Sequence, residues 1–106
     1  MVEELLREDR QLTVLERRSY HRQPFVRPVT ITPTRGVQIP IVGFSKNISQ
    51  AGIGILCMKG IPERLMARIE IHRTSGKPFA VLSECRWCDD FGDGWYISGW
   101  NFMSLG

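Results

Sequence analysis

Cysteine, histidine and long apolar runs are all scarce in this sequence of 106 residues. It has three cysteines and two histidines, and an odd cysteine count argues against a disulfide framework. No window approaches the roughly 18 consecutive apolar residues that a membrane-spanning helix requires. The first ten residues lack the apolar core of a secretory signal. We therefore expect a single cytoplasmic domain with reduced thiols and no membrane span.

Excess charge is also limited, but it is unevenly placed. The formal net charge is only +3. Between Arg10 and Arg35 there are six arginines and one acidic residue, Glu16, whereas from Gly36 onward seven basic residues face six acidic ones. This distribution indicates a local anionic partner for the N-terminal third of the chain.

The first residues of the chain have a helical pattern. Residues 2–12 place four apolar side chains at roughly helical spacing: Val2, Leu5, Leu6 and Leu12. The stripe is thin and the segment short, so a helix here would be marginal on its own. We expect residues 1–15 to form a short N-terminal helix or a flexible segment.

From Pro24 onward the apolar period changes to two, which is typical of strands. Phe25, Val29 and Ile31 share one face, and Ile69 and Ile71 alternate with polar neighbours. About six such runs follow one another with short polar links. Pro40 would interrupt the second run, and the letters "DDFGDG" predict the turn of a final hairpin. The pattern predicts an all-β protein, a six-stranded antiparallel sheet curled into a small barrel or sandwich, and closure would remove its edges.

The pair Cys85 and Cys88, in "CRWC", is the spacing of some redox and zinc sites. Here it falls in a predicted strand, where residues three apart point to opposite faces. No second pair completes four ligands. We expect Cys85 to line the core and Cys88 to lie at the strand end, without a metal.

Other groups that could carry catalysis have simpler explanations. His21 and His72 do not combine with a serine or cysteine and an acid into a triad, and His72 falls on the outward face of its strand. Asp89, Asp90 and Asp93 suit the geometry of the hairpin turn. We therefore expect no enzymatic activity.

Five aromatic residues crowd the last predicted hairpin: Trp87, Trp95, Tyr96, Trp100 and Phe102. Core packing and cross-strand pairing explain them. A platform on which bases stack is the alternative, and it would need basic residues interleaved on one exposed face. Only Arg86 lies nearby, which favours the packing interpretation.

Two separated polar motifs remain. Arg18 and Arg22 form an RxxxR pair in "RSYHR", and about 25 residues later Asn47, Ser49 and Gly52 form an NxSxxG motif in "NISQAG". Either motif alone is weak, since a charge run is commonly solvated and Asn, Ser and Gly are common in bends. Together, at this spacing and in a chain of strands, they are more specific.

The combination resembles the PilZ domain family, whose members bind the bacterial second messenger cyclic dimeric GMP. Gly99 and Phe102 match the small-x-x-aromatic ending of that family. The resemblance covers roughly residues 16–103, so we expect a PilZ-like domain over residues 16–106. It implies a six-stranded antiparallel barrel, which agrees with the strand count above.

The resemblance also implies a role for each motif residue. Arg18 and Arg22 would clamp phosphate and the Hoogsteen edge of guanine, because a guanidinium can donate two parallel hydrogen bonds. The amide oxygen of Asn47 would accept from guanine N1 and N2, and Ser49 would bind phosphate or base. Gly52 would allow a tight turn and close approach of the backbone.

In this family the residue before RxxxR influences how many ligand molecules bind. Arg17 could therefore hold a second, stacked ligand through cation–π and phosphate contacts. Binding would fold the N-terminal segment across the barrel and signal to an unknown protein by contact. Cyclic dimeric GMP is thus the implied ligand, one or two molecules per domain, and no cofactor is expected.

Two other functions stay open at this point. A basic small barrel could bind nucleic acid, with a steep salt dependence and no preference for guanine. A PilZ-like domain could also have lost its ligand and act only as a protein-interaction module. The motif residues favour ligand binding over both.

Overall fold

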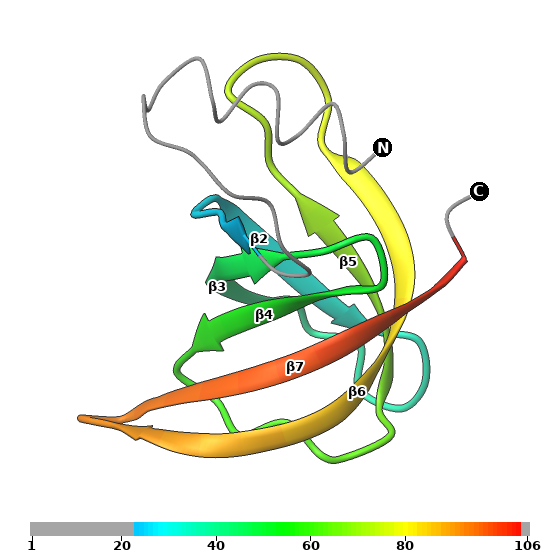
Figure 1. Cartoon of the computed structure of the whole chain (residues 1–106). Coiled ribbons are helices and arrows are strands. Elements are labelled where there is room, and N and C mark those ends of the chain that lie inside the picture. The colour runs from blue at the N-terminus through cyan, green and yellow to red at the C-terminus, as the bar shows by residue number, and fades with distance from the viewer. Residues whose placement is uncertain (1–22, 105–106) are drawn as a thin grey trace.

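The structure, a computed structural model, describes residues 23–104 of the chain. They form seven strands: β1 (Gln23–Pro24), β2 (Pro28–Pro33), β3 (Ile41–Ile48), β4 (Gly52–Cys57), β5 (Met66–Ile71), β6 (Phe79–Gly92) and β7 (Trp95–Ser104). Figure 1 shows the strands curled around one interior, with the β6–β7 hairpin projecting past the barrel. Within this part of the chain, no helix has the length and hydropathy of a membrane span.

The sheet closes on itself. Its strand order is β1-β3-β2-β5-β6-β7-β4, and an additional β3–β4 pairing joins the two ends of the six longer strands. Every pairing is antiparallel. The prediction of an all-β, six-stranded antiparallel barrel is therefore confirmed, and the two-residue β1 is an addition to it.

β1 and β2 follow the same side of β3, with a break between them. Gln23 and Pro24 pair with Ile48 and Asn47, and β2 pairs with β3 again from Pro28. In the break, the buried Ser45 hydroxyl donates to the carbonyl of Phe25 at 2.6 Å and accepts from the backbone N–H of Arg27 at 2.9 Å. This side chain replaces ladder bonds that the interruption removes.

Inward positions of the strands build the core, together with Phe25 and Ile61 from the links between strands. Its buried residues are Phe25, Val29, Ile31, Ile48, Ile53, Ile55, Cys57, Ile61, Ala67, Ile69, Ile71, Val81, Cys85 and Trp100. Each large apolar side chain contributes roughly 1.5–3 kcal/mol when fully buried. The indole N–H of Trp100 donates to Ser98 Oγ at 2.8 Å, so the one polar atom of the largest core residue is paired. The predicted alternation of Ile69 and Ile71 is confirmed.

Two expectations about strand ends were wrong. Pro40 does not interrupt a strand, because β3 begins one residue later, at Ile41. The last hairpin turn is also tighter than "DDFGDG" suggested. β6 continues through Asp89 and Asp90 to Gly92, and the turn consists of Asp93 and Gly94, both with positive φ (55° and 85°). Two left-handed residues are the signature of a type I′ turn, which matches the strand twist.

The expectation that Cys85 and Cys88 point to opposite faces was also wrong. A register shift lies between Cys85 and Trp87 in the β6–β7 pairing. The extra residue in β6 turns Cys88 to the inward face, the same face as Cys85. Cys85 is fully buried, and Cys88 is half-buried against the same core and accepts from the N–H of Ile61 at 3.4 Å. Cys88 therefore lies within β6, and not at its end.

Candidate functional site

The NxSxxG motif forms the bend between β3 and β4. The N–H of Ser49 donates to the carbonyl of Gly52 at 2.9 Å. Ser49 Oγ accepts from the N–H groups of Ala51 and Gly52 at 3.2 and 3.3 Å. The side chain thus closes its own turn, and because both of these bonds use it as an acceptor, its O–H is left to donate elsewhere.

Gly52 is required by the approach of two strands. It pairs with Asn101 of β7, and a Cβ built at this position would collide with the carbonyl oxygen of Trp100. The obstacle is backbone, which cannot swing aside as a side chain can. Gly52 therefore lets β4 and β7 pack closely at the corner where the motif lies.

Asn47 reaches the outer surface through a bulge. The β3–β4 register shifts between Ser45 and Asn47, so Asn47 pairs with Gly54 while its neighbour Ile48 is buried. A Cβ on Gly54 would lie 2.7 Å from Asn47 Oδ1, which places the amide against the bare backbone of β4. The amide lies on the barrel wall, one strand away from the chain that enters through β1.

A flat strip continues from Asn47 across the next two strands. Gly54 pairs with Gly99 of β7, and Gly99 pairs with Trp87 of β6. A Cβ on Gly99 would collide with the indole of Trp87, so the ring lies over this glycine. We call this row of four residues the glycine row: Asn47, Gly54, Gly99 and Trp87. It has an amide at one end, an indole at the other and two glycines between them.

The glycine row includes three residues that the sequence analysis did not assign to the site: Gly54, Gly99 and Trp87. Trp87 was assigned to packing, yet it is 41% exposed, while Trp100 is buried. The letters "GIGIL" contain a usable signal, because two glycines that are two residues apart on a strand leave the same face of the sheet without side chains. Only the β4–β7–β6 register, however, brings Trp87 to that face.

The RxxxR pair and Arg17 lie outside the described residues. Arg17, Arg18 and Arg22 precede Gln23, where the description begins. Gln23 pairs with Ile48, between Asn47 and Ser49 in sequence. The chain that carries the arginines therefore joins the barrel beside the NxSxxG motif.

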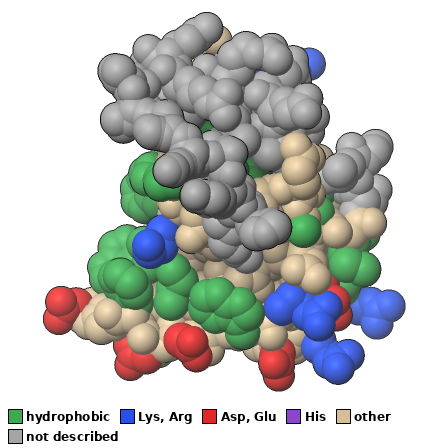
Figure 2. Space-filling view, in the orientation of Figure 1, with side chains coloured by type: hydrophobic (Ala, Val, Ile, Leu, Met, Phe, Trp, Pro, Cys, Tyr) green, Lys and Arg blue, Asp and Glu red, His purple; other side chains and the backbone are tan. Residues whose placement is uncertain are grey.

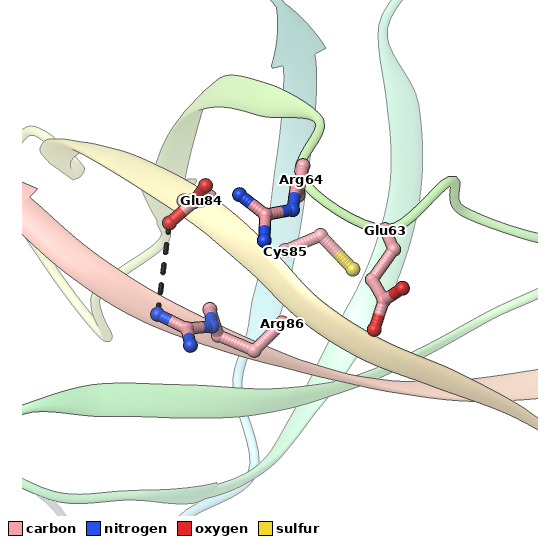
Figure 3. A pocket seen from close by; sticks show the side chains of 5 residues that line it. All are labelled: Glu63, Arg64, Glu84, Cys85 and Arg86. Carbon is pink, nitrogen blue, oxygen red and sulfur yellow. Dashed lines mark ion pairs between the residues drawn. The ribbon is translucent and has the colours of Figure 1, made fainter.

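A separate shallow hollow lies beside β6 and involves the thiol of Cys85 (Figure 3). Glu63, Arg64, Glu84 and Arg86 line it with two acidic and two basic groups, and Arg86 Nη1 lies 3.8 Å from Glu84 Oε1. Burial raises the pKa of Cys85 to about 11, which keeps the thiol protonated at neutral pH. The hollow thus offers neither net charge nor a thiolate. In residues 23–104, no group of three or more His, Cys, Asp or Glu side chains could hold a metal ion.

Comparison with known families agrees with this geometry. The sequence matches the PilZ domain over residues 16–106, and the chain belongs to that family. PilZ domains generally bind cyclic dimeric GMP and are typically receptor domains without catalysis. No curated protein matched the chain.

Proposed function

We propose that this chain is a receptor for cyclic dimeric GMP that binds the messenger between the RxxxR pair and the NxSxxG corner. One observation carries the proposal. Gln23, which directly follows Arg22, pairs with Ile48, between Asn47 and Ser49. The chain that follows the RxxxR pair thus enters the barrel at the end of β3 that carries the NxSxxG motif, which supports a site made from both motifs.

The chemistry of the ligand suits both motifs. It carries two phosphodiester charges and two guanines, and Arg18 and Arg22 supply the planar donors that fork onto phosphate or onto guanine O6 and N7. Asn47 faces the outer wall with an amide oxygen that can accept from guanine N1 and N2, and Ser49 has an O–H to donate to phosphate. The RxxxR pair thus supplies positive charge and planar donors, and the NxSxxG motif supplies the acceptor that the arginines lack.

The glycine row extends the proposed site. A purine is flat, and Gly54 and Gly99 let the amide of Asn47 and the indole of Trp87 lie close against the wall, so a base can pack on the outer side of these two groups. Trp87, with 41% of its surface exposed, ends this strip with an aromatic ring. Base–aromatic stacking is worth roughly 1–3 kcal/mol per base, so Trp87 would add to affinity without choosing between purines. Guanine selection would rest on Asn47 and the arginines.

Arg17, the arginine directly before the RxxxR pair, is the reason to propose a second, stacked ligand molecule. Its guanidinium could contact a phosphate and stack on a base at once. Binding would order the segment that carries the arginines against the barrel, and this change would pass to a partner protein by contact. The signal would thus depend on the ligand bridging two parts of the chain.

Calorimetric titration with cyclic dimeric GMP, and in parallel with its adenine analogue, tests the proposal. We expect saturable binding of the guanine compound with two molecules per chain. The adenine compound should bind at least roughly tenfold more weakly, because it leaves buried polar groups unpaired. A flat titration with the guanine compound at millimolar concentration would refute the proposal.

The same titration separates this function from nucleic-acid binding. A single-stranded oligonucleotide that bound more tightly than the cyclic dinucleotide, with a steep loss of affinity in salt, would favour a nucleic-acid-binding barrel. A receptor for a small dianion should lose much less affinity over the same salt range, because few counterions are released.

A further inference from the structure

The outer wall of the barrel carries an apolar patch next to the glycine row. Phe44 of β3 pairs with Leu56 of β4, and Leu56 pairs with Ile97 of β7. These three side chains lie in one row, two residues further along β4 and β7 than Gly54 and Gly99. At about 3.3 Å per residue, the two rows are roughly 7 Å apart. Figure 2 shows hydrophobic side chains gathered over this part of the face.

Exposure of the patch is high for apolar side chains. Val42 is 73% exposed, Met58 64% and Phe44 47%, while Leu56 and Ile97 are half-buried. We call these five residues the apolar patch. They alternate with inward residues that already complete the core, so closure of the barrel does not need them.

The opposite part of the wall shows that an apolar exterior is not a general property of this barrel. Outward positions of β2 and β5 are occupied by Thr30, Thr32, Arg68 and Glu70, and the last two form an ion pair at 3.2 Å. A solvated face of an antiparallel sheet is normally polar in this way. The β3–β4–β7 face departs from that rule, and a contiguous exposed apolar patch marks an interaction site.

Charge beside the apolar patch is negative. Residues 87–97 contain three aspartates and no lysine or arginine. Asp89 pairs with Ile97 at the edge of the patch, and Asp90 and Asp93 lie further along the same hairpin, all exposed. Figure 2 shows acidic side chains along this margin of the hydrophobic area. The patch is thus apolar at its centre and acidic along the hairpin.

We propose that the apolar patch docks a segment of a partner protein, with apolar side chains along its centre and lysine or arginine along the edge that meets the hairpin. An amphipathic helix with a basic edge has this chemistry. A second copy of the chain that docked through the same face fits less well, because in the described part of the chain the patch strands carry one basic residue, Lys46, and Lys59 follows β4, against three carboxylates. This docking face goes beyond the proposed ligand function and does not depend on it.

An 18-residue synthetic peptide of leucine and lysine, with leucines at helical spacing, serves as the probe. A peptide with glutamate in place of lysine is its control. Both are labelled, and binding to the full chain is measured by fluorescence anisotropy without any cyclic dinucleotide. We expect the lysine peptide to bind and the glutamate peptide to bind at least roughly tenfold more weakly. The net charge of +3 works against this result, so a preference for the lysine peptide must come from the acidic margin.

Substitutions locate the contact. Phe44→Ser with Met58→Ser should weaken binding of the lysine peptide at least roughly tenfold, because both side chains bury apolar surface on docking. Met103→Ser is the matched control, since Met103 is 53% exposed on β7 away from the patch, and it should leave binding unchanged. Asp89→Asn with Asp90→Asn should weaken binding and flatten its salt dependence.

Three outcomes would overturn the proposal. The peptides could bind equally, or the Met103 variant could lose as much affinity as the patch variant. Sedimentation could instead show a dimer of the unmodified chain that the patch variant abolishes, and the face would then be a contact between copies. None of these outcomes bears on binding of the cyclic dinucleotide, which is measured separately.

Discussion

Gly52 and Gly99 both leave the outer wall of the barrel without a side chain, but they face different neighbours. At Gly52 an added methyl group would meet the carbonyl of Trp100, which belongs to the backbone of β7. At Gly99 it would meet the indole of Trp87, an exposed side chain that can rotate away. The first glycine thus maintains strand packing, and the second maintains the position of a ring.

The two alanine variants should therefore differ in kind. Gly52→Ala should lower the free energy of unfolding by about 1–3 kcal/mol, since overpacked backbone must shift. Gly99→Ala should cost less stability but weaken binding of cyclic dimeric GMP, because the ring of Trp87 leaves its place. Urea unfolding followed by tryptophan fluorescence, together with calorimetry, measures both effects. Equal stability losses with unchanged affinity would contradict this distinction.

Of the three arginines assigned to the proposed site, Arg22 directly precedes Gln23, which pairs with β3 beside the NxSxxG corner. A bidentate arginine–guanine contact is worth roughly 1–3 kcal/mol. Arg22→Ala should therefore weaken binding of cyclic dimeric GMP about tenfold or more, with little change in stability. Arg35→Ala, in the exposed link between β2 and β3, is the matched control in the same calorimetric titration. Equal affinity of the two variants would remove Arg22 from the site.

At the scale of elements, the break between β1 and β2 depends on one hydroxyl. Ser45 is 1% exposed, and its hydroxyl forms hydrogen bonds with the carbonyl of Phe25 and the backbone N–H of Arg27 in the break. Without it, a buried carbonyl and a buried N–H lose their partners. The break also sets the position of β1, and β1 connects the arginine segment to the corner.

Ser45→Ala should lower the free energy of unfolding by about 1–3 kcal/mol, the usual cost of leaving buried polar groups unpaired. Ser83→Ala provides a matched control, because Ser83 is equally buried and its hydroxyl has no hydrogen-bond partner. That variant should be nearly neutral or slightly stabilising. Chemical denaturation of the two variants tests the difference, and similar losses would show that the hydroxyl of Ser45 does not hold the break.

The burial of Cys85 in β6 makes stability depend on pH. Burial raises the pKa of Cys85 from 9.0 to about 11, so the thiol ionises later in the folded state than in the unfolded state. The resulting stability is fully present below pH 9 and is lost between about pH 9 and 11. Two pKa units correspond to about 2–3 kcal/mol.

Comparison with Cys85→Ala isolates this effect from other groups that titrate in the same range. Urea unfolding at pH 8, 9, 10 and 11 should show the unmodified chain losing more stability than the variant as pH rises. Parallel pH profiles of the two proteins would mean that Cys85 ionises in the folded state as readily as in the unfolded state.

At the scale of the whole molecule, alternation in the sequence was enough to predict the barrel but could not predict its bulges. A period of two identifies inward residues such as Ile69 and Ile71 as long as no residue is inserted. Each bulge shifts the parity by one, which is why the prediction for the face of Cys88 was wrong. The tight turn at Asp93 and Gly94 left the preceding aspartates inside the strand.

The candidate site was predictable only in part, for a related reason. Asn47, Ser49 and Gly52 are neighbours in sequence, so a local motif shows them together. Gly54, Gly99 and Trp87 come from three strands, and only the register of the closed sheet brings Trp87 beside the two glycines. The sequence shows which residues are glycine or tryptophan, but it does not show which of them lie side by side on the outer face of the barrel.

The proposed site is made from two motifs that are distant in sequence, and a nuclear magnetic resonance titration with cyclic dimeric GMP tests whether the ligand joins them. In the ¹⁵N-labelled chain, the side-chain amide of Asn47, the backbone N–H of Gly52 and the indole N–H of Trp87 are separate probes. We predict that all three signals shift together on addition of the ligand, and that Arg22→Ala reduces all three shifts at the same ligand concentration. Shifts concentrated on the outer face of β2 and β5, with these three signals unmoved, would contradict the proposed site.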